Sequence, residues 1–181
     1  IRRQERRLQE AAEMIRVAVL TISDSSAAGT REDLSGPAVR DQAEQLGWKV
    51  IMTAVAPDER NAIASRLISL TGYDAPDVIL TTGGTGVALR DVTPEATRSV
   101  LEREIPGLGE LMRSEGRQST PFAALSRAIA GTRGRSLIVN LPGSPKGAVE
   151  SIQAIADLIP HIVDLLHGRT EHTAPSKRTP S

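Results

Sequence analysis

Short apolar segments alternate along the chain with segments whose apolar residues recur at helical spacing. Three segments rich in Val, Ile and Leu, each followed by Ser, Gly or Pro, are expected to form buried strands: residues 16–23, 77–82 and 135–141. A fourth segment, residues 48–55, mixes polar and apolar side chains, which favours a strand nearer the edge of a sheet. Helical patterns cover residues 36–46, 59–70, 94–104 and 147–166, and a bend is expected at Pro160 in the last of them.

This alternation predicts the fold class. Strand, helix, strand, helix is the order of a doubly wound α/β domain, and nearly continuous apolar strands are typical of a mostly parallel sheet with helices on both faces. We therefore expect a three-layer α/β domain over residues 15–167. A charged extension with weak helical amphipathicity is expected at residues 1–14, and a polar, disordered tail at residues 168–181.

Composition excludes several classes of function. The 22 basic and 22 acidic residues cancel and only 2% of residues are aromatic, so the charge and the stacking surface of a nucleic-acid binder are both lacking. Because there is no cysteine, disulfides, thiolate zinc sites and thiol nucleophiles are excluded. No apolar run approaches the roughly 20 residues that cross a bilayer, and the first residues lack the apolar stretch of a secretory signal. We expect a cytoplasmic protein with neither membrane nor nucleic-acid partners.

The loops that follow the predicted strands are the candidate ligand site, because ligands of such sheets bind at the carboxyl ends of the strands. The clearest loop carries the sequence TTGGTG, from Thr81 to Gly86. Its glycines, Gly83, Gly84 and Gly86, allow the backbone to approach an anion closely and to direct N–H groups at it. The loop has neither the lysine of a P-loop nor the spacing of a dinucleotide-binding turn.

Two aspartates follow predicted strands or adjoin the glycine loop. Asp91 precedes a helix start for which Thr93, as a capping hydroxyl, and Pro94 already account. A carboxylate beside an anion-binding loop repels phosphate unless a cation lies between them, so Asp91 suggests Mg²⁺. Asp58 either caps the helix that follows it or faces the same pocket as Asp91, and the sequence leaves both interpretations open.

Two more strand ends carry polar residues. The loop that begins at Asn140 places Gly143 and Ser144 near a helix N-terminus, where N–H groups favour a negative ligand. Ser23 and Asp24 follow the first strand, and no histidine is near them in the sequence, which argues against a Ser-His-Asp hydrolase. Ser126 and Arg127 are placed either near an anion or on the polar face of a helix, and the pattern does not decide between these.

Taken together, these blocks resemble the MogA/MoaB family and the matching N-terminal domain of gephyrin. The sequences TTGGTG, RDVTPEAT, LSR and NLPGSPKG occur in the family's order, and the resemblance covers residues 15–167. It implies a molybdopterin-binding α/β fold that assembles as a homotrimer, or as a hexamer if an N-terminal helix pairs two trimers. It also implies molybdenum cofactor biosynthesis, with Mg²⁺-dependent transfer of AMP from ATP to molybdopterin, release of pyrophosphate and a molybdate-inserting enzyme downstream.

The resemblance also assigns roles to particular residues. The family's two catalytic and metal-binding aspartates fall on Asp58 and Asp91. Its nucleotide and pterin loops fall on Ser23, Asp24, Gly83, Gly84, Thr85, Gly86, Asn140, Pro142, Gly143 and Ser144. Three alternatives remain: a MoaB-type paralogue that binds molybdopterin or a protein partner without catalysis, the related domain of a molybdate-inserting or competence-type protein, and a nucleotide-binding domain with another substrate.

Overall fold

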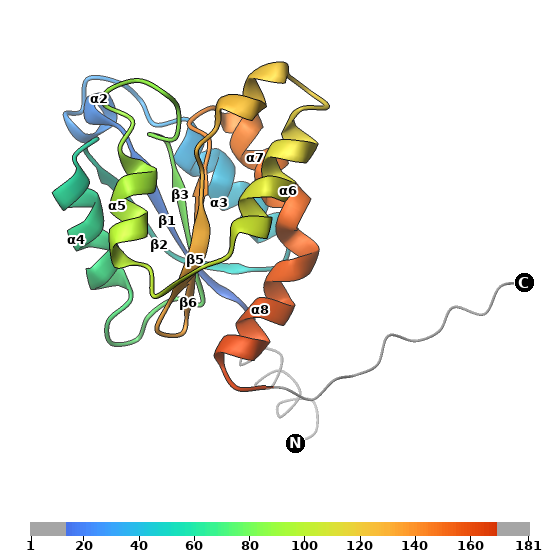
Figure 1. Ribbon diagram of the computed structural model, residues 1–181. Helices are drawn as coiled ribbons and strands as arrows, with labels where there is room; N and C mark the ends of the chain where they lie inside the picture. The colour runs from blue at the N-terminus through green and yellow to red at the C-terminus, as the bar shows by residue number, and fades with distance from the viewer. Residues whose placement is uncertain (1–13, 170–181) are drawn as a thin grey trace, which may run out of the picture.

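A computed structural model describes residues 14–169 as a six-stranded sheet between two layers of helices (Figure 1). The extension predicted over residues 1–14 and the tail predicted over residues 168–181 lie outside the described residues, apart from Met14, Gly168 and Arg169. The strands are β1 Arg16–Ile22, β2 Lys49–Ala56, β3 Val78–Thr82, β4 Arg103–Glu104, β5 Ala130–Arg133 and β6 Ser136–Leu141. The sheet order is β2-β1-β3-β6-β5-β4, and the first four strands in this order run parallel.

The helices divide between the two faces of the sheet (Figure 1). They are α2 Asp24–Ala27, α3 Ser35–Gln45, α4 Arg60–Leu70, α5 Thr93–Val100, α6 Pro106–Gly116, α7 Pro145–Ile155 and α8 Ile159–Leu166, with 3-10 turns η1 Pro121–Leu125 and η2 Ala156–Leu158. One core joins Val17 and Val19 of β1 to α3, α6, α7 and α8, and the other joins Ala18 and Leu20 to α4 and α5. This alternation along one strand confirms the predicted three-layer, doubly wound α/β class.

Most predicted elements are confirmed to within a residue or two, but the end of one predicted helix is wrong. The strand over residues 48–55 is β2, which lies at the edge of the sheet as expected. The helix predicted over residues 94–104 is wrong beyond Val100, because Arg103 and Glu104 pair with β5 instead. The predicted bend in the last helix occurs at η2, just before Pro160, which occupies the first turn of α8 and supplies no N–H to continue the helix.

The chain reverses its direction of travel across the sheet between β1 and β3. The connection from β1 to β2 passes through α3 on one face, whereas the connection from β2 to β3 passes through α4 on the other. Such a reversal leaves a crevice outside the carboxyl ends of the two central strands. Within residues 14–169, no helix is both long and apolar enough to span a bilayer.

Candidate functional site

The loops predicted to bind ligand meet at one edge of the sheet. Parallel register aligns Ile22 with Ala56 and Thr82 with Leu141, so β1, β2, β3 and β6 end side by side. The N–H of Gly83 donates to the carbonyl of Leu141 at 3.2 Å, which ties the loop after β3 to the loop after β6. This common edge is where parallel sheets place their ligands.

The glycine turn after β3 depends on backbone conformations that other residues rarely adopt. Gly83 and Gly84 have φ angles of 109° and 65°. A Cβ at Gly83 would lie 2.2 Å from the carbonyl oxygen of Ile22, and a Cβ at Gly84 would lie 3.1 Å from Oδ1 of Asp58. Within residues 14–169, the N–H groups of Gly84, Thr85 and Gly86 donate to no protein acceptor. The turn therefore presents backbone donors beside a carboxylate.

Asp58 is held at the end of β2 by a reciprocal pair of hydrogen bonds with Asp24. The N–H of Asp24 donates to Oδ2 of Asp58 and the N–H of Asp58 donates to Oδ1 of Asp24, both at 2.9 Å. Glu59 is the N-cap residue of α4, and no side chain caps this helix. The interpretation of Asp58 as a helix cap is therefore wrong. The first and second strand ends are thus joined through two aspartates.

Asp91 enters the site from the loop that leads into α5. Its Oδ2 accepts a hydrogen bond from the N–H of Ala88 at 2.9 Å and faces Gly86, whose Cβ would lie 2.7 Å from that oxygen. Asp58 and Asp91 line one cavity of about 260 Å³ together with Gly83, Gly84, Ser23 and Gly143. The structure therefore places both predicted aspartates on the same side of the sheet, beside the glycine turn.

The electrostatics of this cavity are dominated by crowded negative charge. Partial burial raises the pKa of Asp58, and repulsion by Asp24 and Asp91 raises it further against the opposing hydrogen bond from Asp24. Asp24 behaves oppositely, because the guanidinium of Arg90 donates to its Oδ2 at 2.6 and 2.9 Å and holds the pKa of Asp24 below its ordinary value. Both oxygens of Asp24 are thus engaged within the protein, whereas Asp58 and Asp91 retain acceptor capacity.

The raised pKa of Asp58 predicts how stability changes with pH. The folded protein holds this proton more tightly than the unfolded chain, so ionisation of Asp58 lowers the free energy of unfolding. This loss of stability is absent below the ordinary aspartate pKa of 3.8 and develops as the pH rises through the raised pKa of Asp58. We expect the advantage of Asp58→Asn over wild type, measured by urea unfolding, to grow from acid to neutral pH. A stability difference between Asp58→Asn and wild type that is constant over this pH range would contradict a raised pKa for Asp58.

The two carboxylates fit a divalent cation that is completed by a ligand. Within residues 14–169, no group of three or more His, Asp or Glu side chains is placed to hold a metal ion. Mg²⁺ is commonly held by one or two carboxylates, with phosphate oxygens and water supplying the remaining ligands. Asp58 and Asp91, which repel each other across one cavity, match that donor set and would be relieved of repulsion by a cation.

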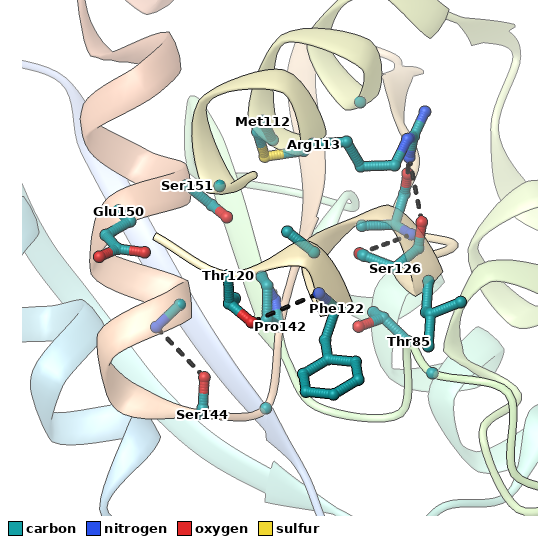
Figure 2. A pocket seen from close by; sticks show the side chains of 18 residues that line it. Thr85, Met112, Arg113, Thr120, Phe122, Ser126, Pro142, Ser144, Glu150 and Ser151 are labelled. Carbon is teal, nitrogen blue, oxygen red and sulfur yellow. Dashed lines mark hydrogen bonds between the residues drawn. The ribbon is translucent and has the colours of Figure 1, made fainter. Parts of the chain in front are cut away.

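A second cavity, of about 290 Å³, adjoins the glycine turn at Thr85 and Gly86 (Figure 2). The predicted residues Thr85, Gly86, Pro142, Gly143 and Ser144 line it, and Ser144 also caps α7 by accepting a hydrogen bond from the N–H of Gly147. Side chains that the sequence analysis did not identify complete its walls from α6, η1 and α7: Met112, Arg113, Thr120, Phe122, Leu125, Glu150 and Ser151. Since Gly143 lines both cavities, they adjoin each other.

Two predicted roles are corrected by the structure. The side chain of Asn140 lies between the sheet and α5, where it is fully buried and its amide donates to the hydroxyls of Thr81 in β3 and Thr97 in α5 at 3.0 and 2.9 Å. It stabilises β6 against its neighbours and does not line either cavity. The hydroxyl of Thr93 does not cap α5, because Val92 is the N-cap residue and Thr93 lies buried inside the first turn.

Comparison with known proteins gives consistent matches over most of the chain. A family model described as a probable molybdopterin binding domain matches residues 18–161. The molybdopterin adenylyltransferase of Helicobacter pylori strain J99 is 44% identical over 156 residues, or 85% of this chain and 89% of that protein. The molybdopterin adenylyltransferase of Escherichia coli K12 is 36% identical over 176 residues, or 89% and 90% of the two chains. The crystal structure of the molybdopterin biosynthesis enzyme MoaB from Thermus thermophilus is 49% identical, has a TM-score of 0.81, and is matched over 86% of this chain and 98% of that chain.

Proposed function

Because the chain belongs to the molybdopterin-binding family, we propose that it is a molybdopterin adenylyltransferase that transfers AMP from ATP to molybdopterin in molybdenum cofactor biosynthesis. The observation that carries this proposal is the convergence of Asp58, Asp91 and the glycine turn on one cavity, with a second cavity adjoining it at Gly143. Two adjoining cavities suit a reaction that joins two phosphorylated molecules, because their phosphates must meet at one place.

In the proposed reaction, a terminal phosphate oxygen of molybdopterin attacks the α-phosphorus of ATP. The new P–O bond forms as the bond from the α-phosphorus to the bridging oxygen breaks, and pyrophosphate leaves with that electron pair. The free N–H groups of Gly84, Thr85 and Gly86 align the phosphates and stabilise the charge that develops on the transferring group. No protein nucleophile is required, so the lack of cysteine in the chain is no obstacle.

Asp58 and Asp91 are the residues that would hold Mg²⁺ in this reaction. A bound Mg²⁺ would offset the negative charge of the phosphates. The protein supplies fixed positions for the two carboxylates, since Asp58 is braced by Asp24 and Asp91 is braced by the N–H of Ala88. Such fixed positions reduce the reorganisation that accompanies transfer.

The two cavities suggest where the two ring systems lie. Phosphates belong beside the carboxylates, in the cavity that contains Asp58 and Asp91. The neighbouring cavity has an apolar lining that includes Met112, Phe122 and Leu125, with Ser144 and Ser151 as polar groups, and this lining suits a flat heterocycle. One ring therefore enters this cavity while its phosphate reaches across Gly143.

The proposal includes a homotrimer, paired into a hexamer if the N-terminal extension joins two trimers, that acts in the cytoplasm upstream of a molybdate-inserting enzyme. An exposed edge strand supports self-association, because Ile51, Met52 and Val55 of β2 are each more than a third exposed. Light scattering of the purified protein measures the assembly. A monomer at assay concentration would contradict the trimer and leave the transfer chemistry unaffected.

Direct detection of the product tests the proposed activity. The purified protein is incubated with molybdopterin, ATP and Mg²⁺, and the adenylylated pterin and pyrophosphate are quantified by mass spectrometry and a coupled assay. We expect both products to form in equal amounts and to disappear when Mg²⁺ is chelated. Binding of molybdopterin without either product would support the non-catalytic alternative, and ATP binding that is unaffected by the pterin would point to another substrate.

A further inference from the structure

Each of the three guanidinium nitrogens of Arg127 contacts the protein. Its Nε donates to the carbonyl of Gly86 at 2.7 Å, its Nη2 donates to the carbonyl of Asp91 at 2.5 Å, and its Nη1 forms an ion pair with Glu95. Its backbone N–H also donates to the carbonyl of Thr85 at 2.8 Å. These four contacts hold the side chain in one orientation, directed at the loop and at α5.

These acceptors bracket one loop. Gly86 begins the loop between the glycine turn and α5, and Asp91 lies near its end. Arg127 therefore donates hydrogen bonds to both ends of this loop. Between them the loop has almost no apolar packing, because Val87 is 70% exposed and Leu89 is 100% exposed. Without a buried apolar anchor, the position of the loop depends on its polar contacts.

The ion pair between Arg127 and Glu95 connects the loop to helix α5. Glu95 lies in the first turn of α5, whose Ala96 and Val100 pack into the core beside α4. Although burial alone raises the pKa of Glu95, the hydrogen bond from Arg127 keeps it below its ordinary value, so Glu95 stays ionised. The loop is thereby fixed relative to the helix and the sheet together.

We propose that Arg127 is a positioning residue of the transfer reaction, whose guanidinium fixes the loop from Gly86 to Asp91 and so sets the carboxylate of Asp91 against the glycine turn. This inference rests on the proposed function. It assigns Arg127 a role through Asp91 and not through contact with substrate. Lysine cannot replace it, because a single ammonium group cannot reproduce the planar fork that reaches two carbonyls and a carboxylate at once.

The test compares Arg127→Met and Arg127→Lys with a matched control, Arg133→Met. Arg133 is also half-buried, and its guanidinium also binds a carbonyl and a side chain, Val100 and Thr71, but it lies where β5 turns into β6, away from the glycine turn. Four quantities are measured for each protein: kcat, KM for molybdopterin, the Mg²⁺ concentration at half-maximal rate, and hydrogen–deuterium exchange of the peptide spanning residues 86–91. Thermal unfolding reports the change in stability.

For both Arg127 variants we expect kcat to fall roughly 100-fold, the usual effect of misplacing a catalytic group by about an ångström. The half-saturating Mg²⁺ concentration and the exchange rate over residues 86–91 should rise, while KM for molybdopterin changes little. Arg133→Met should lower thermal stability and leave the other quantities unchanged.

Three results would overturn the proposal. The first is unchanged exchange over residues 86–91 in Arg127→Met. The second is a loss of activity that Arg133→Met reproduces to the same degree. The third is recovery of full activity by Arg127→Lys. Exchange is measured without turnover, so a wild-type protein that makes no adenylylated pterin refutes the proposed function separately from the loop contact.

Discussion

Replacing Asp91 with Asn should reduce kcat for AMP transfer roughly 100- to 1,000-fold while leaving molybdopterin binding nearly unchanged. Asparagine has almost the same shape and can still accept the hydrogen bond that Oδ2 of Asp91 receives from Ala88. What is lost is one negative charge of the cavity lining, which also contains the carboxylates of Glu32, Asp33 and Asp58. The substitution therefore separates the charge of this side chain from its part in the structure of the loop.

The measurement combines steady-state pyrophosphate release with fluorescence titration of the pterin. Asp41→Asn serves as the control, because Asp41 is an exposed α3 carboxylate that is paired with Arg40 and does not line the cavity. We expect this control to retain wild-type rates. Asp91→Asn activity equal to that of an active wild type would refute a metal-binding role for Asp91.

Replacing Gly83 with Ala should lower the free energy of unfolding by roughly 4 kcal/mol, the sum of backbone strain and overpacking. The φ of 109° is unfavourable for alanine. The added methyl would also meet the Ile22 carbonyl oxygen at 2.2 Å, and this atom belongs to β1 and cannot rotate away. The cost is therefore expected to displace the end of β3 from the end of β1, with loss of activity.

Urea unfolding of Gly83→Ala and Gly134→Ala separates the two contributions. Gly134 also has a positive φ, 56°, but a Cβ there would have no neighbour within 4 Å. Its alanine variant should lose only about 1 kcal/mol, the cost of the backbone conformation alone. If the two variants were equally stable, close contact between the ends of β1 and β3 would not be the reason for glycine at this position.

Much of the fold was predictable because each buried strand has a distinct apolar pattern. The segments that form β3 and β6 each contain a short run of aliphatic, mostly β-branched residues, at positions 78–80 and 137–139, and every residue of both strands is buried. The short strands β4 and β5 carry no such pattern. Strand β5 forms by pairing with the adjacent β6, and Arg103 and Glu104 then pair with β5, which prevails over their local helical preference.

Site residues that are required by the backbone conformation could be predicted from the sequence. The hydrogen-bond partners of polar side chains could be predicted less well. Gly83 and Gly84 are marked by residue type, because the turn requires a positive φ. Asn140 has the sequence context of a loop residue, yet its amide is buried between the sheet and α5, where it donates to the hydroxyls of Thr81 and Thr97. The partners of an amide or a guanidinium depend on tertiary packing, which a single sequence does not encode locally.

The packing of Gly143 has a thermodynamic consequence. A Cβ on Gly143 would lie 3.3 Å from the Cα of Gly83, and the backbone of Gly143 forms part of the partition between the two cavities. A ligand that displaces the backbone of Gly143 from one cavity changes the volume of the other cavity. Binding in the two cavities is then thermodynamically linked. Because linkage is reciprocal, the factor by which ATP changes the affinity for the pterin equals the factor by which the pterin changes the affinity for ATP.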